Sequence, residues 1–426
     1  MSNTEVDVTI KEEVADGSPT GVEEKSEENT REEPFDPTQI SIDVKLIIVD
    51  SIIRRLLNNS IRLAPAFQRN EVWNIERKSR LIESLMLKIP IPMFYVSSDQ
   101  KGNYDVVDGL QRLSTIRDFV LGEDYIKTKD ESKRGKGFQL KGLEFWGEKY
   151  NNKTFNELPP EFKDRILETE FRFTVINPGT PEEVKRNIFK RVNTGGMPLT
   201  AQEIRHALYQ GEATKLLEEL AKSEVFNIAT GEAVDDSRMA ARELVLRFLS
   251  FSLFNYKDYP KSSDMDAFMS NAMRVINLMP DIKIEELKKI FKDSDKDPYV
   301  PLLRYTDVDS LKKRFFIGMK RANELFGKLA FRRHSKSGRM NPLNKTLFEA
   351  WGNVLADLDE DSYKRLIKNK DILDNTYTKK AEELTFNNSF SRYNAKYTDV
   401  QYRYKVLKEC LTNAIGIDGG RNVNNP

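Results

Sequence analysis

The most constraining feature of this sequence is a hairpin pattern enclosed between two helical patterns. Apolar residues recur at helical spacing over 75–89. Two short apolar runs follow at 93–96 and 104–107, with polar turn-forming residues between them, and this arrangement predicts an antiparallel hairpin. Helical spacing returns over 113–121. Because helix and strand patterns alternate so closely, this part of the chain is expected to form a mixed α and β domain.

The pattern then changes along the chain and divides it into three parts. A length of 426 residues is enough for two or three domains. Residues 1–37 are rich in Glu, Ser, Thr and Gly, which predicts a disordered acidic tail. Residues 38–210 carry the mixed pattern, including a further strand over 170–176, and residues 211–426 are helical throughout. We therefore expect an α+β N-terminal domain followed by a mostly α-helical domain.

The net charge of +1 conceals two segments of opposite sign. Residues 1–36 contain 12 acidic and 3 basic side chains, whereas residues 310–345 contain 11 Lys and Arg and a single acid, Glu324. Concentrated positive charge is typical of proteins that bind a phosphate backbone, although a solvated helix face gives the same pattern. The acidic tail either stays solvated or competes for this basic surface. The predicted nucleic-acid-binding residues are Lys312, Lys313, Arg314, Lys320, Arg321, Arg332 and Arg333.

Several classes of protein are disfavoured by composition. The single cysteine, Cys410, excludes an internal disulfide and a cysteine-cluster metal site. The two histidines, His206 and His334, are far apart in sequence, so nuclease activity that depends on a His-Asn-His site is not expected within the chain. No apolar run approaches the roughly 18 residues of a membrane span, and no secretory signal begins the sequence. A cytoplasmic protein with no membrane partner is the expectation.

The segment Asp108-Gly109-Leu110-Gln111-Arg112 lies where the second predicted strand leads into a helix. A helix N-terminus offers free N–H groups and a positive dipole end, which suit a phosphate. Arg112 would clamp phosphate oxygens, Gln111 would orient a water molecule and Asp108 would hold a metal ion. An ordinary Asp-Gly turn with Asp108 as N-cap explains the same residues, so this segment alone leaves both interpretations open.

Further motifs accompany this segment in a defined order. They are Pro65-Ala66-Phe67-Gln68-Arg69 with Trp73, the helical Arg80-Leu81-Ile82-Glu83-Ser84-Leu85 that leads to Ile89-Pro90-Ile91-Pro92, and the loop Asn193-Thr194-Gly195-Gly196 followed by Gln202-Glu203-Ile204-Arg205. In this order the motifs resemble the N-terminal family of GmrSD-type restriction endonucleases, whose ParB/sulfiredoxin-like domain carries an Asp-Gly-Gln-Gln-Arg signature. The resemblance extends over roughly residues 40–250.

The resemblance implies a domain that binds a nucleoside triphosphate with Mg²⁺, hydrolyses it in some members, and couples it to DNA recognition or restriction of phage. Asp108 and Gln111 would be catalytic, and Asp108 would hold the metal. Leu110 departs from the signature, because the family has a glutamine there, and this places hydrolysis in more doubt than binding. The implied nucleotide-binding residues are Gln68, Arg69, Asp108, Gly109, Gln111, Arg112, Asn193, Thr194, Gly195 and Gly196.

These observations favour a nucleotide-binding regulatory or sensing component of a DNA-directed, anti-phage defence system of the restriction type. DNA and a separate nuclease or defence-system subunit are the expected partners. One alternative is a nucleoside triphosphate hydrolase coupled to DNA binding. The other is a non-catalytic scaffold for protein interactions, in which the signature persists only as part of the fold.

Overall fold

The chain divides into two compact units, which are described separately. The computed structural model describes residues 10–15, 17–24, 41–63, 73–192, 199–262, 264–291, 300–333, 340–391 and 395–416. Residues 32–208 form one unit, called here the sheet unit, and residues 1–31 combine with 209–426 in the other, called the helical unit. The predicted fold class is confirmed, because the first unit mixes strands and helices and the second is mostly helical.

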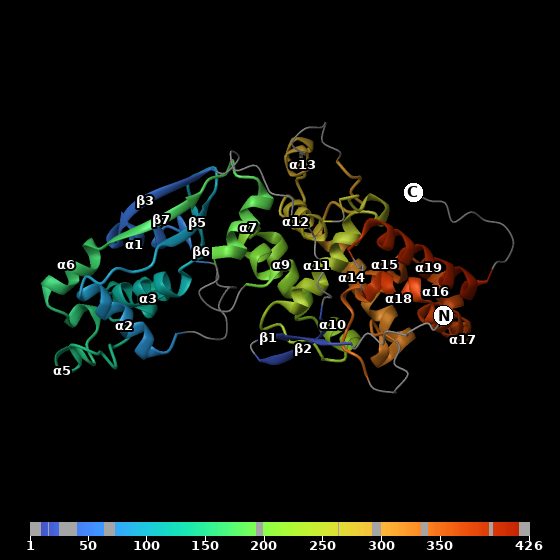
Figure 1. Cartoon of the computed structure of the whole chain (residues 1–426), viewed down its shortest axis with the longest axis horizontal. Helices are drawn as coiled ribbons and strands as arrows, with labels where there is room; N and C mark the ends of the chain where they lie inside the picture. Colours follow the sequence, from blue (N-terminus) through green and yellow to red (C-terminus); the bar gives the residue numbers. More distant parts are fainter. Residues whose placement is uncertain are drawn as a thin grey trace, which may run out of the picture. The chain divides into compact units, whose positions relative to one another are not determined.

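A five-stranded mixed sheet organises the sheet unit (Figure 1). The predicted hairpin is present, with Val96 opposite Val106 in an antiparallel pair. The strand predicted over 170–176 pairs in parallel with the first strand of that hairpin, which requires the long crossover between them. In spatial order the strands are β3 (Ile42–Ile48), β7 (Glu170–Ile176), β5 (Phe94–Ser98), β6 (Tyr104–Asp108) and β4 (Ile61–Arg62).

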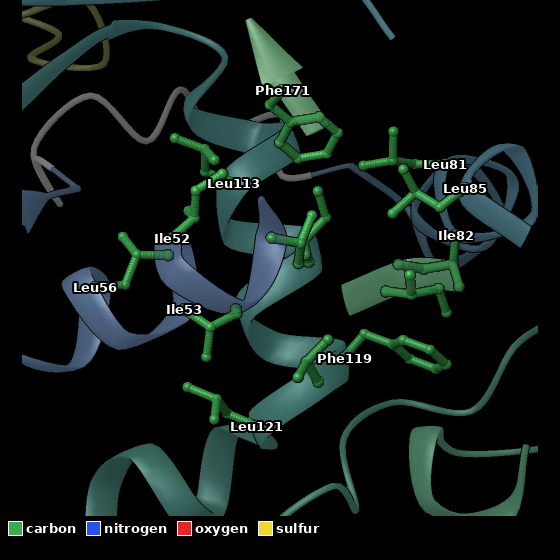
Figure 2. Close-up of a cluster of buried hydrophobic side chains, with 14 of the residues drawn as sticks. Ile52, Ile53, Leu56, Leu81, Ile82, Leu85, Leu113, Phe119, Leu121 and Phe171 are labelled. Atoms are coloured by element: carbon green, nitrogen blue, oxygen red, sulfur yellow. The ribbon is translucent and has the colours of Figure 1, made fainter. Parts of the chain in front are cut away.

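Helices cover both faces of this sheet. Successive strand residues point to opposite faces, so Val106 and Val107 of β6 belong to different hydrophobic clusters. The Val106 face packs on α1 (Val49–Leu57), α2 (Ile75–Met86), α3 (Leu110–Leu121) and α6 (Pro160–Glu168), and the Val107 face packs on α7 (Glu182–Val192) and α8 (Ala201–Leu208). The crossover also contains the short helices α4 (Glu123–Thr128) and α5 (Gly147–Tyr150). Figure 2 shows side chains of α1, α2 and α3 gathered around one another with Phe171 of β7.

The helical unit is built around α11 (Ala240–Leu253) and α15 (Lys345–Ala356), which are buried along almost their whole length. Both contact α14 (Val308–Phe326), and α11 also contacts α9 and α12. The other helices are α9 (Glu212–Ala221), α10 (Glu224–Thr230), α12 (Met265–Ile276), α13 (Ile284–Ile290), α16 (Glu360–Lys368), α17 (Lys370–Glu382), α18 (Leu384–Ser391) and α19 (Tyr397–Ile415).

A buried ion network crosses the core of the helical unit. The carboxylate of Glu349 on α15 lies 2.7 Å from Nε of Arg247 on α11 and 3.0 Å from Nη2 of Arg403 on α19. All three side chains are almost completely inaccessible to solvent. Charges so far from water are tolerated only when they are paired, so the three helices are tied together by one carboxylate.

An N-terminal hairpin belongs to the helical unit, within the segment for which the sequence predicts disorder. Its strands are β1 (Glu12–Ala15) and β2 (Ser18–Glu23), and the N–H of Glu23 donates to the carbonyl oxygen of Leu343 at 2.8 Å. The Glu23 carboxylate pairs with Arg333 at 2.8 Å and accepts a hydrogen bond from Asn344 at 2.9 Å. The prediction of disorder is therefore wrong for these strands, because composition does not reveal partners so distant in sequence. The other tail residues lie mostly outside the described part.

We expect Glu23→Gln to change the pH dependence of stability. Burial raises the pKa of Glu23, while Arg333 and Asn344 oppose the shift. The native carboxyl group thus holds its proton to a higher pH than the unfolded chain does, so the stability contributed by Glu23 falls as pH rises through that window. The free energy of unfolding of the variant, relative to wild type, should therefore increase as the pH rises above the ordinary pKa of a glutamate. Urea unfolding at a series of pH values measures this free-energy difference, and Glu286→Gln serves as an exposed control. A difference between variant and wild type that decreases with rising pH would contradict the prediction.

Candidate functional site

The motif Asp108 to Arg112 lies at the junction between β6 and α3. β6 ends at Asp108, Gly109 occupies the N-cap position, and α3 begins at Leu110. Because Gly109 has no side chain, the N-cap residue gives the first turn of α3 no side-chain hydrogen bond. The first backbone N–H groups of a helix have no partner within it, so this junction presents hydrogen-bond donors and the positive end of the helix dipole.

Gly109 is required by both the backbone and the packing of the junction. Its φ is 94°, in the left-handed region that side chains disfavour. A Cβ atom at this position would overlap the ring of Phe94, lying 2.7 Å from its Cε1 atom. Phe94 is buried against Phe171 and Phe173, with ring centroids 4.9 and 5.2 Å away. The junction is therefore built directly on the hydrophobic core.

Arg112 is held in place by several contacts within the sheet unit. Its Nη2 atom lies 2.9 Å from Oδ2 of Asp108, and its guanidinium lies 4.5 Å from the centroid of the Phe94 ring. It also donates to the carbonyl oxygens of Pro92 and Met93. Burial lowers the pKa of Arg112, and Asp108 opposes this shift. The guanidinium thus ties α3 to the segment before β5, and little of it is left for the bidentate phosphate clamp expected from the sequence.

Asp108 and Gln111 are more available than Arg112. The side chain of Asp108 is 37% exposed, against 12% for Arg112. Gln111 is half-buried, and its side-chain amide makes no hydrogen bond with any described residue. Among the residues that the structure describes, no group of three His, Cys, Asp or Glu side chains is arranged to hold a metal. Asp108 would therefore fit Mg²⁺ as a single carboxylate ligand, with the remaining ligands from a bound polyphosphate and water.

The other predicted site segments, Gln68-Arg69 and Asn193-Thr194-Gly195-Gly196, lie outside the described residues, as does His334. The chain on either side of 193–196 nevertheless has a defined place. Ile188 of α7 and Leu199 after the loop both pack against the hydrophobic cluster that includes Val107 of β6. The chain therefore leaves and re-enters this loop close to the end of β6 that carries Asp108.

Two buried polar residues of α8 were not selected by sequence analysis as site residues. Arg205 donates from Nε to the side-chain oxygen of Gln202 at 3.0 Å, and both side chains are buried. The Nε2 atom of Gln202 makes no hydrogen bond with any residue that the structure describes. Ile204 of the same helix packs with Val107 of β6. Both residues belong to the motif Gln202-Glu203-Ile204-Arg205, which the sequence analysis used only as support for the family resemblance.

In the described part of the basic stretch, residues 310–333 and 340–345, the cationic side chains do not form a continuous exposed surface. Arg314 donates to the carbonyl oxygen of Asn353, and Arg321 donates to that of Leu355, so both bind the C-terminal end of α15. Arg332 is also buried and donates to backbone carbonyls.

The described arginines of this stretch therefore stabilise the helical unit, which corrects the prediction that Arg314, Arg321, Arg332 and Arg333 bind nucleic acid. Arg333 pairs with Glu23, and Lys312 pairs with Glu219 at 2.7 Å. Of the seven predicted residues, Lys313 and Lys320 are the ones that lie fully exposed. A count of charges along the sequence does not show which guanidinium groups point inward, toward carbonyl oxygens contributed by other helices.

The mixed sheet, its covering helices and the polar junction define an α+β domain with one strand-to-helix site. Residues 53–210 match the family model of the GmrSD restriction endonuclease, N-terminal domain. This match confirms the predicted resemblance over residues 53–210, and the similarity points to restriction-type defence. Searches of curated proteins and of solved structures gave no match. Within the described part, no helix is long and apolar enough to cross a membrane.

Proposed function

We propose that this protein is a nucleotide-binding sensing component of a DNA-directed, restriction-type defence system. The observation that carries the proposal is the start of α3, where no N-cap side chain is present. Beside it lie the partly exposed carboxylate of Asp108 and the amide of Gln111, which makes no hydrogen bond with any described residue. The phosphates of a nucleoside triphosphate would lie against the first N–H groups of α3, as anions do at helix N-termini. Gln111 would donate to a phosphate oxygen, and Asp108 would hold Mg²⁺ bound to the phosphates. DNA and a separate nuclease subunit complete the proposed system.

Hydrolysis of the nucleotide is the second candidate, and the free amide of Gln111 favours it. Such an amide is suited to orient an attacking water molecule. Leu110, however, packs against the hydrophobic core and provides no second amide. Binding without rapid turnover is therefore the primary proposal, in which the occupied site changes the behaviour of a partner.

Calorimetric titration of the full chain with ATP, GTP and CTP in the presence of Mg²⁺ tests this proposal. Phosphate release is measured on the same samples. Binding without release supports a sensor, and binding with release supports the hydrolase. If none of the three nucleotides binds, the nucleotide site is wrong and the scaffold alternative is favoured.

Gln111→Ala should weaken nucleotide binding about tenfold, because a hydrogen bond to a charged phosphate contributes about 1.5 kcal/mol. The matched control is Gln100→Ala, the same substitution at the exposed turn between β5 and β6, at the opposite end of β6 from Asp108. The control should bind as wild type does. Equal affinities for the two variants would show that Gln111 does not contact the ligand.

A further inference from the structure

A groove of about 450 Å³ lies along α19 in the helical unit. Its lining residues all belong to residues 209–426, so it is separate from the β6–α3 junction. Two ammonium groups, a hydroxyl group and an amide face it together with one aromatic ring and one carboxylate. The lining residues are Tyr256, Lys405, Lys408, Glu409, Thr412 and Asn413.

The aromatic ring in this groove is held by neighbouring side chains. The ring of Tyr256 stacks on that of Tyr404, with centroids 4.5 Å apart and an interplanar angle of 3°. The Nζ atom of Lys408 lies 4.8 Å from the centroid of the same ring. Gln401 also donates to the carbonyl oxygen of Tyr256 at 2.6 Å. The ammonium group of Lys408 is therefore positioned by the fold, and the groove offers positive charge rather than a free platform for stacking.

Positive charge exceeds negative charge around Lys408. The carboxylate of Asp357 is already bonded to Arg304 at 2.6 Å and to Arg314 at 2.8 Å. Burial lowers the pKa of Lys408; Asp357 raises it, and the like charges of Lys257, Arg304 and Arg314 lower it further. Two carboxylates, Asp357 and Glu409, are thus outnumbered by five cations, and an anion from outside the chain would relieve the repulsion between the cations. The cations are Lys257, Arg304, Arg314, Lys405 and Lys408.

We propose that this groove, together with Lys257 and Arg304, binds the phosphodiester backbone of DNA. Lys405 and Lys408 of α19 and Lys257 are exposed, and the side chain of Arg304 is 29% exposed, so a duplex can reach these cations. Lysine and arginine side chains supply the sequence-independent part of DNA binding through the phosphates. The inference rests on the DNA-directed function proposed above, and it moves the contact surface from the stretch 310–345 to α19.

The test measures binding of the full chain to a fluorescein-labelled duplex of random sequence by anisotropy, over a series of salt concentrations. The triple variant Lys257→Gln/Lys405→Gln/Lys408→Gln should bind about 10- to 100-fold more weakly at low salt, with a salt slope shallower by about 0.9 for each phosphate that it no longer neutralises. The matched control, Lys313→Gln/Lys320→Gln/Lys328→Gln, removes the same charge from exposed lysines elsewhere and should stay within about threefold of wild type.

A second variant keeps the test valid if the triple variant unfolds. Lys405 is 73% exposed and pairs with Glu409 only at 3.9 Å, so Lys405→Glu should leave the fold intact and still weaken binding. The groove would be ruled out as the site if a folded groove variant bound DNA with wild-type affinity, or if the groove and control variants lost equal affinity. DNA binding by the protein would still stand in both cases. A wild-type chain that does not bind DNA would overturn both the groove and the DNA-directed part of the proposed function, and the nucleotide titration would still stand by itself.

Discussion

Replacing Glu349 with alanine is expected to lower the free energy of unfolding of the helical unit by about 3–5 kcal/mol. The carboxylate is completely buried and is shared by Arg247 and Arg403. Without it, two guanidinium groups would remain in the core without their counter-charge. The cost arises from these unpaired charges, because a buried charge stripped of its partner loses both hydration and Coulomb attraction.

The matched control for this variant is Glu286→Ala. Glu286 also pairs with a cation, Lys289, at 3.3 Å, but both side chains are well exposed. An exposed pair of this kind contributes about 0–1 kcal/mol. Urea unfolding monitored by circular dichroism measures both variants. If both variants lost similar free energy of unfolding, the Glu349 network would be accessible to water.

Replacing Gly109 with alanine is expected to destabilise the sheet unit by about 2–5 kcal/mol and to abolish nucleotide binding at the β6–α3 junction. Two costs combine. A side chain in the left-handed region costs about 1–2 kcal/mol, and forcing a methyl group into the Phe94 ring costs about 1–3 kcal/mol more. Phe94 cannot move away easily, because Phe171 and Phe173 pack against it.

Gly102→Ala separates these two costs. Gly102 also has a positive φ, 79°, in the turn of the same hairpin, but an added Cβ atom there would have no neighbour within 4 Å. This control should show the backbone cost alone, about 1 kcal/mol, and should bind nucleotide as wild type does. Thermal unfolding of both variants gives the comparison. Equal decreases in the unfolding temperature of the two variants would mean that the junction can relax around a methyl group.

The two variants address different parts of the molecule, and together they separate stability from function. Gly109 lies at the proposed nucleotide site, so its replacement should affect binding as well as folding. Glu349 lies in the helical unit, far along the chain from the motif. If Glu349→Ala stays folded at low temperature, its nucleotide affinity should match wild type, because the β6–α3 junction belongs to the sheet unit.

Much of the sheet unit was predictable because its signals are local. The periodicities over 75–89, 93–96 and 104–107 became α2, β5 and β6 with small shifts of their ends, and β7 has the predicted bounds. The position of Asp108 to Arg112 at a strand-to-helix junction followed from the same patterns. Each of these features depends on the conformational preferences of neighbouring residues, which a single sequence displays directly.

The contacts of charged side chains were not predictable in the same way. Arg112 has the residue type of a phosphate clamp, yet the structure engages it with Asp108 and two backbone carbonyls. Arg314 and Arg321 have the spacing of a basic face, yet they bind the end of α15. Part of the acidic tail, for which composition predicts disorder, forms a hairpin strand. Its Glu23 carboxylate pairs with Arg333 and Asn344, which lie more than three hundred residues later in the chain.

Local sequence patterns were enough to predict the fold class, the order of strands and helices around the motif, and the family that residues 53–210 resemble. Which charges are structural and which can meet a ligand became apparent from the folded chain. It buried Arg314, Arg321 and the Glu349 network, and it left Gln111 and the cations along α19 accessible. The physical reason is that periodicity is a property of neighbouring residues, whereas the burial and pairing of a charge depend on residues brought together from distant parts of the chain.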